Sequence, residues 1–284
     1  MEKVTRIFLA MCMIFATTLA QAQINMPQPS PKAKLEQKVG LTDVTIEYAR
    51  PSMRGRTIFG DLVPYGKIWR LGANAATKLT VSDEVEIAGN KLEAGSYALF
   101  AIPGENEWTI VVNKNWEQWG TGEYKEEEDV FRFTTEVKAT SSLVETFEIG
   151  IGNLSHTKAD LYIKWENAKV VIPMTVEVDS KVMADIKRNL RVDPRDYYMA
   201  ATYYHESGKD LKQAHEWISK AIEVYEEDGA NAFWVYRRKA LIEADMGDKE
   251  TAIVTAKKSM EKAKEAGNDD YVRMNEKSIE EWSK

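Results

Sequence analysis

The spacing of apolar residues along this 284-residue chain changes once, close to Val178. Before that point apolar and polar residues alternate, as in residues 44–48 (VTIEY) and 161–165 (LYIKW), and turn-forming residues separate the runs. Alternation with period two is typical of strands that bury one face. The pattern predicts about nine short antiparallel strands over residues 28–178, and that many strands without an amphipathic helix predict a β-sandwich.

After Val178 the apolar residues recur every three to four positions, which is the spacing of an amphipathic helix. Asp193 and Asp210 are expected to cap two of the helices, and Pro194 suits a first helical position. An internal repeat of 38 or 39 residues pairs Tyr197 with Tyr236, Ala201 with Ala240, Gly208 with Gly247 and Ala214 with Ala252. A repeat of this kind predicts stacked helical hairpins.

This half resembles tetratricopeptide repeats, which place a large residue, a small residue, an aromatic residue, a glycine and an alanine in that order. The match is incomplete, because the repeat exceeds the usual length of about 34 residues and because Lys239 and Glu243 replace a large and an aromatic residue. The resemblance implies a concave surface that engages a peptide or protein partner. The expected fold class is therefore α+β and multidomain, with a β-sandwich over residues 23–178 and a helical hairpin array over residues 179–284.

Residues 1–22 have the features of a secretory signal peptide. Basic Lys3 and Arg6 precede an apolar run of thirteen residues, and small residues precede the expected cleavage after Ala22. The apolar run is shorter than the roughly 20 residues that span a membrane, so no transmembrane segment is expected in the mature chain. We expect a periplasmic, cell-surface or secreted protein that loses its one cysteine, Cys12, with the signal.

Composition and motifs exclude several functional classes. A net charge of −7 argues against a protein that binds nucleic acid by neutralising phosphates. The three histidines, His156, His205 and His215, are not part of an HExxH motif, and the chain has no GxSxG, P-loop or GxGxxG motif. We therefore assign no catalytic residue, metal site or cofactor.

Residues 49–78 carry six basic side chains and one acidic side chain, Asp61. Arginine binds carboxylates, phosphates and sulfates through two parallel hydrogen bonds, and glycines in this segment let the backbone approach such a group. One interpretation is an anion-binding loop, with the candidate residues Arg50, Arg54, Arg56, Arg70 and Asn74. The other is a long connection whose arginines pair with acidic residues of the same module.

A second candidate surface is aromatic. Trp116 and Trp119 lie in a sequence, WEQWGTG, that is typical of a loop. An exposed indole offers a flat apolar face on which sugars or prolines stack, while its N–H donates a hydrogen bond. The alternative is that both residues close the end of the core.

Several motifs of the first half are similar to the exported bacterial domain of unknown function numbered 2911. They include residues 48–52 (YARPS), 55–60 (GRTIFG), 62–66 (LVPYG), 68–74 (IWRLGAN), 92–97 (LEAGSY) and 107–110 (EWTI). The similarity covers about residues 28–175. It implies an exported β-rich module, often followed by tetratricopeptide-like helices, with no established activity or catalytic residues.

Together these features lead to the hypothesis of an exported, non-enzymatic binding or scaffold protein of the bacterial cell envelope. The sandwich would hold an anionic small molecule or glycan, and the helices would engage a protein or peptide. One alternative is a carbohydrate-binding module or carbohydrate-active enzyme that uses exposed tryptophans. Another is a purely structural envelope component whose loop arginines form internal ion pairs.

Overall fold

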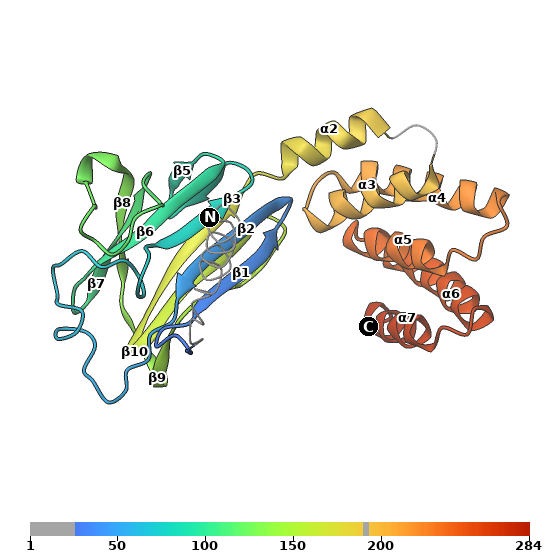
Figure 1. Cartoon of the computed structure of the whole chain (residues 1–284). Coiled ribbons are helices and arrows are strands. Elements are labelled where there is room, and N and C mark those ends of the chain that lie inside the picture. The colour runs from blue at the N-terminus through green and yellow to red at the C-terminus, as the bar shows by residue number, and fades with distance from the viewer. Residues whose placement is uncertain (1–25, 190–192) are drawn as a thin grey trace, which may run out of the picture. The chain divides into compact units, whose positions relative to one another are not determined.

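The computed structural model describes residues 26–189 and 193–284 and divides the chain into two units (Figure 1). A strand-rich unit, Met1–Glu177, is followed by a helical unit, Val178–Lys284, which confirms the α+β class. The expected signal peptide, with its cleavage after Ala22, lies outside the described residues. Within the described ranges, no helix combines the length and the apolar character needed to cross a membrane.

The strand-rich unit contains a six-stranded and a four-stranded antiparallel sheet. The larger sheet has the order β1-β2-β3-β6-β7-β8, with bounds Lys32–Val39, Thr42–Ala49, Thr77–Val81, Gly95–Pro103, Glu107–Asn113 and Asp129–Glu136. The smaller sheet has the order β5-β4-β10-β9, with bounds Asn90–Leu92, Val85–Ile87, Lys158–Val176 and Lys138–Gly152. A short 3₁₀ helix, η1 (Glu126–Glu128), precedes β8.

Two hairpins show how the local sequence sets the pairing of strands. Gly40, at φ 56°, opens the two-residue turn between β1 and β2, and Val39 pairs with Thr42 across it. Ala88 and Gly89 both have positive φ in the turn between β4 and β5. Strands β9 and β10 are longer than the short strands that the sequence predicts, with 15 and 19 residues, and their pairing shifts register on both sides of Glu166.

The inward faces of the two sheets meet in an aromatic core. Trp69, from the connection between β2 and β3, stacks on Trp165 of β10 with 5.9 Å between ring centroids. Trp69 also contacts Trp108 of β7, Phe147 of β9 and Phe59 of the same connection, at centroid distances of 5.8, 5.3 and 5.9 Å. The Tyr48 hydroxyl of β2 adds a polar link, because it donates to the Ile149 carbonyl of β9 at 3.0 Å. The long connection is thereby held against both sheets.

A second, smaller core lies on the outward face of the six-stranded sheet. Buried Ala98, Phe100 and Val111 belong to strands β6 and β7, and Trp116 and Tyr124 from the following loop pack against them. This loop covers the outward face of β6 and β7. The outward face of β1, β2 and β3 contributes lining residues to a pocket instead.

Six helices form the helical unit: α2 (Asp179–Asn189), α3 (Pro194–Glu206), α4 (Leu211–Glu227), α5 (Phe233–Asp245), α6 (Lys249–Glu265) and α7 (Asp269–Trp282). Two predicted caps are confirmed, since the Asp193 carboxylate accepts from the backbone N–H of Arg195 and the Asp210 carboxylate accepts from that of Lys212. The repeated alanines all have no exposed surface: Ala201, Ala214, Ala240 and Ala252. Small residues at these positions let neighbouring helices approach closely.

Candidate functional site

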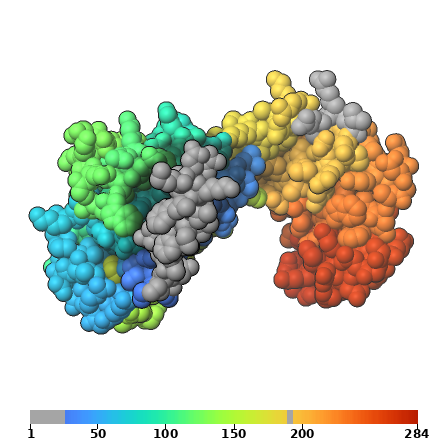
Figure 2. Space-filling model, viewed as in Figure 1, coloured from blue at the N-terminus to red at the C-terminus, as the bar shows by residue number. Residues whose placement is uncertain are grey.

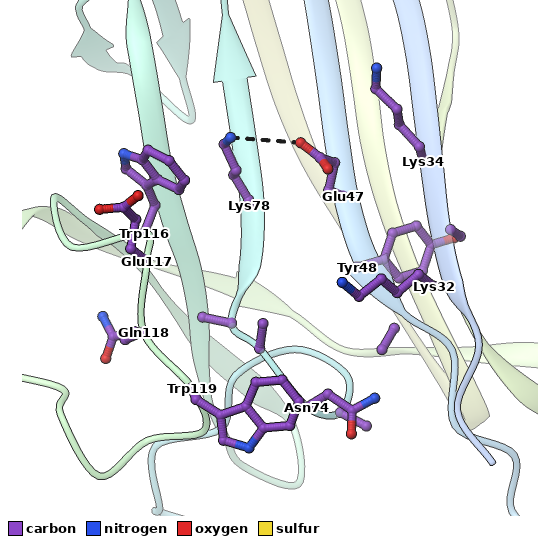
Figure 3. Close-up of a pocket in the computed structure, with 15 residues that line it drawn as sticks. Lys32, Lys34, Glu47, Tyr48, Asn74, Lys78, Trp116, Glu117, Gln118 and Trp119 are labelled. Carbon is purple, nitrogen blue, oxygen red and sulfur yellow. Dashed lines mark ion pairs between the residues drawn. The ribbon is translucent and has the colours of Figure 1, made fainter. Parts of the chain in front are cut away.

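A pocket with a volume of about 450 Å³ lies over the first three strands of the six-stranded sheet (Figure 3). Strand β1 contributes Lys32 and Lys34, strand β2 contributes Glu47, and strand β3 contributes Lys78. The other walls come from two loops, residues 73–76 and 116–119. Ligand pockets in proteins have volumes of about 300–1,000 Å³, so this one is large enough for a small ligand.

The register of the sheet explains why charged groups line this pocket. Lys34 is paired with Glu47, and Glu47 is paired in turn with Lys78, so the three side chains form one row across three strands. Every second residue of a strand faces the same side, so this row points outward while Leu35 and Ile46 point toward the core. The lining also contains Ala49, Ala73, Ala75 and Ala76, whose small side chains leave the space open.

Trp119 stands at the edge of the pocket and is 68% exposed. Backbone contacts hold its loop against residues 74–76. The Ala76 N–H donates to the Gln118 carbonyl at 3.1 Å, and the Gly120 N–H donates to the Asn74 carbonyl at 3.0 Å. Ala75 and Trp119 also form a β-bridge. These contacts fix the backbone of Trp119, while its indole ring remains exposed to solvent.

A polar cluster anchors the far end of the same loop. Asn113, which has no exposed surface, donates to the Asp129 carboxylate at 2.8 Å, and the Tyr124 hydroxyl donates to the other oxygen of that carboxylate at 2.9 Å. Arg132 donates both to Asp129 and to the Tyr124 oxygen. Burial, together with the hydrogen bond to Asp129, raises the pKa of Tyr124 to about 12. The phenol therefore stays neutral well above ordinary pH.

The three lysines of the pocket differ in what their ammonium groups contact. The Lys78 Nζ lies 3.9 Å from the centroid of the Trp116 ring and 3.7 Å from the Glu47 carboxylate. Lys34 pairs with Glu36, whose hydrogen bond and charge raise the pKa of Lys34. Lys32 has no ion pair among residues 26–189 and 193–284. Figure 3 shows it across the pocket from Trp116.

The candidate arginines do not line this pocket. Three of them donate to backbone carbonyls instead. Arg50 Nε donates to the Phe147 carbonyl at 3.0 Å, and Arg54 Nη2 donates to the Pro29 carbonyl at 3.0 Å. The Arg56 guanidinium donates to the carbonyls of Met53 and Ser52 at 2.9 and 2.8 Å. Arg70 is half-buried, and its Nε has no hydrogen-bond partner among the described residues. Desolvation by burial lowers the pKa of Arg70.

Acidic groups near this segment bind its backbone rather than its guanidinium groups. The Glu166 carboxylate accepts from the N–H groups of Ile58 and Phe59 at 3.1 and 3.2 Å, and Glu145 accepts from the N–H of Arg54 at 2.8 Å. In the space-filling view the segment, in light blue, forms part of the surface of the strand-rich unit (Figure 2). The hydrogen bonds from Glu166 and Glu145 fix the backbone path of this connection between β2 and β3.

One glycine of this connection is required by a close approach. Gly72 has φ 129°, and a Cβ added there would lie 2.6 Å from the backbone oxygen of Ala49. On either side of it, Leu71 and Asn74 also have positive φ. One local and one long-range hydrogen bond maintain this backbone: the Trp69 indole donates to the Gly72 carbonyl at 3.1 Å, and the Asn74 amide donates to the Ser30 carbonyl at 3.4 Å.

The structure brings three of the seven predicted site residues together, Asn74, Trp116 and Trp119, and adds lysines that sequence reasoning did not select. The period-two spacing of Lys32, Lys34 and Glu36 was the available signal, since it places three charges on one face of a strand. The described residues contain no group of three metal-ligating side chains. The two histidines of the helical unit each contact a carboxylate: His205 Nε2 lies 2.8 Å from Asp245 Oδ2, and His215 Nε2 lies 3.2 Å from Glu243 Oε1.

Comparison with known proteins gives one match. The family described as "Protein of unknown function (DUF2911)" matches residues 30–174, which contain both sheets except for the last two residues of β10. Neither the curated proteins nor the solved structures include a match to the chain.

Proposed function

The chain belongs to the DUF2911 family, and from that premise we propose that its family domain is a non-enzymatic module that binds carbohydrate in the pocket beside Trp119. The exposed indole of Trp119 is the observation that carries this proposal. An exposed indole leaves a large apolar surface in contact with water, which is unfavourable relative to burying it. A sugar ring stacked on the indole would remove that surface from water.

The other lining groups fit the hydroxyl-rich edge of a sugar. Asn74 and Glu47 supply amide and carboxylate groups, which donate to or accept from hydroxyls. The alanine floor leaves room for a ring, and Trp116 forms a wall that packing against Phe100 and Lys78 keeps in place. An apolar surface with a few oriented polar groups is the usual composition of a small-molecule site.

Replacing Trp119 tests the proposal directly. We expect the wild-type protein to bind at least one member of a panel of bacterial and plant oligosaccharides, measured by tryptophan fluorescence and by calorimetry. Trp119→Ala should weaken that binding at least about 30-fold, as truncation of an aromatic hot spot does, whereas Trp119→Tyr should keep most of it. Absence of binding by the wild-type protein across the panel would contradict the proposal.

We also infer that the two sheets form a β-sandwich and that the helices form a tetratricopeptide-like array. The aromatic contacts between the sheets support the first inference, and the recurrence of buried alanines supports the second.

We propose that the array engages a protein or peptide, because it exposes the apolar side chains of Met199, Met246, Val254 and Met274. A photo-crosslinker at Met199 should then capture a partner, and one at Lys91 of β5 should not.

Export to the periplasm or cell surface is a further part of the proposal and depends on the sequence of residues 1–22. The mature protein from the native cell envelope should begin at Gln23 when its mass is measured. A mass that includes residues 1–22 would contradict export by this signal.

A further inference from the structure

We propose that the sugar bound beside Trp119 is acidic and that the ammonium group of Lys32 receives its carboxylate, sulfate or phosphate. This inference rests on the proposed carbohydrate site and adds to it the chemical class of the ligand. Three lysines and two glutamates contribute to the lining of this pocket, so the pocket carries a small excess of positive side chains in a protein whose net charge is −7.

The contacts already made by the lysines single out Lys32. Lys78 is held between the Trp116 ring and the Glu47 carboxylate, and Lys34 is held by Glu36. These contacts neutralise two of the three ammonium groups. Lys32 has no such carboxylate within residues 26–189 and 193–284, so its ammonium group remains the available cation of the lining.

The position of Lys32 suits an anionic group on a stacked sugar. Figure 3 shows the Lys32 side chain on the same side of the pocket as Asn74, with Trp119 at the end of the pocket next to Asn74. A ring on the indole would therefore have Asn74 at its edge and Lys32 within reach of a substituent. The glutamates do not compete for this place, because Glu47 is paired with Lys78 and because Glu117 is drawn on the far side, next to Trp116.

The backbone before β1 fixes where Lys32 emerges. The Arg50 N–H donates to the Pro31 carbonyl at 2.9 Å, the Asn74 amide donates to the Ser30 carbonyl, and the Arg54 guanidinium donates to the Pro29 carbonyl. Three consecutive carbonyls are thus held by the segment that also shapes the pocket. Because this backbone is fixed, only the side-chain torsions of Lys32 have to be ordered when its ammonium group binds an anion.

Matched pairs of acidic and neutral ligands test the inference. The probes are oligosaccharides that contain uronate, and sugars that carry phosphate or sulfate, each beside its carboxyl-reduced, dephosphorylated or desulfated counterpart. We expect the wild-type protein to bind at least one acidic probe at least about tenfold more tightly than its neutral counterpart, as a charge-assisted hydrogen bond would give. The relative affinities for carboxylate, phosphate and sulfate distinguish the three sources of negative charge.

The variant Lys32→Gln should weaken binding of the acidic probe severalfold more than binding of its neutral counterpart, so that most of the preference for the acidic probe is lost. Lys38→Gln is the matched control, because Lys38 lies on the same strand, pairs with Asp43 and does not line the pocket. Equal binding of both members of every pair would overturn the acidic ligand and leave the carbohydrate site intact. Failure of every probe, acidic and neutral, would overturn both proposals.

Discussion

The strand-rich unit holds two groups of basic side chains that differ in what their charged atoms contact. Arg50, Arg54 and Arg56 are close together in the sequence, and each donates to a backbone carbonyl. Lys32 and Lys78 are far apart in the sequence, but the pairing of three strands brings them to one pocket. A local excess of charge in a sequence therefore does not show where a charge is available to a ligand.

The two regions also differ in how they use tryptophan. Trp69, in the arginine-rich connection, is 6% exposed and has four aromatic neighbours between the sheets. Trp119, at the pocket, has a backbone held by a β-bridge to Ala75, and its indole ring is exposed to solvent. Burial of Trp69 stabilises the fold, whereas the proposed binding depends on the exposed ring of Trp119, so the same kind of substitution is expected to have opposite effects in the two regions.

The largest effect on stability is expected at Trp69. Trp69→Ala should lower the free energy of unfolding by about 3–5 kcal/mol, because it removes a large buried side chain from the aromatic core. Trp119→Ala should change it by less than about 0.5 kcal/mol, because the side chain is exposed. Urea denaturation of both variants measures the difference, and similar losses at the two positions would contradict the division between the regions.

A smaller effect of the same kind is expected at Arg50. Arg50→Met keeps most of the side-chain stem but removes the hydrogen bond to the Phe147 carbonyl, which should cost about 1–2 kcal/mol of unfolding free energy. Carbohydrate binding should be unchanged after correction for the folded fraction. If Arg50→Met bound the ligand more than tenfold more weakly while remaining folded, the arginine-rich segment would itself be part of a binding site.

Local signals in the sequence predicted the local parts of this structure. The caps at Asp193 and Asp210 depend on a few neighbouring residues, and the loop around Trp119 was recognised from its own composition. The partner of Arg50 could not be predicted in the same way, because Phe147 lies 97 residues away and the contact is with a carbonyl that every residue possesses.

The pocket was only partly predictable for a related reason. Asn74, Trp116 and Trp119 were selected by residue type, whereas Lys32 and Lys78 reach the pocket through the register of β1, β2 and β3. A register shift of one residue would turn those side chains to the other face. The lengths of β9 and β10 were also missed, because the irregular pairing around Glu166 interrupts the simple alternation.

The loop that carries the tryptophans should respond to alkaline pH through Tyr124. Its pKa is raised from 10.0 to about 12, so its contribution to stability is present below pH 10 and is lost as the pH rises from 10 to about 12. Denaturant unfolding at intervals between pH 9 and 12 should show a fall in wild-type stability that is shallower in Tyr124→Phe. The pKa values of Tyr97, Tyr162, Tyr225 and Tyr236 are also raised, so absorbance at 295 nm should show several late-titrating tyrosines, one fewer in this variant, and identical titrations would contradict the assignment.

The smallest predicted effect belongs to Arg54, which connects the two regions. Its guanidinium holds the Pro29 carbonyl three residues before Lys32, so Arg54→Ala should loosen the start of β1 without removing a group that touches the ligand. We expect a loss of about two- to threefold in affinity for an acidic sugar and no loss for its neutral counterpart. If Arg54 acts by positioning Lys32, the loss should disappear when Arg54→Ala is combined with Lys32→Gln, as calorimetry can measure. An equal loss in both backgrounds would mean that Arg54 contacts the ligand directly, and the arginine-rich segment would then regain the binding role that its charge first suggested.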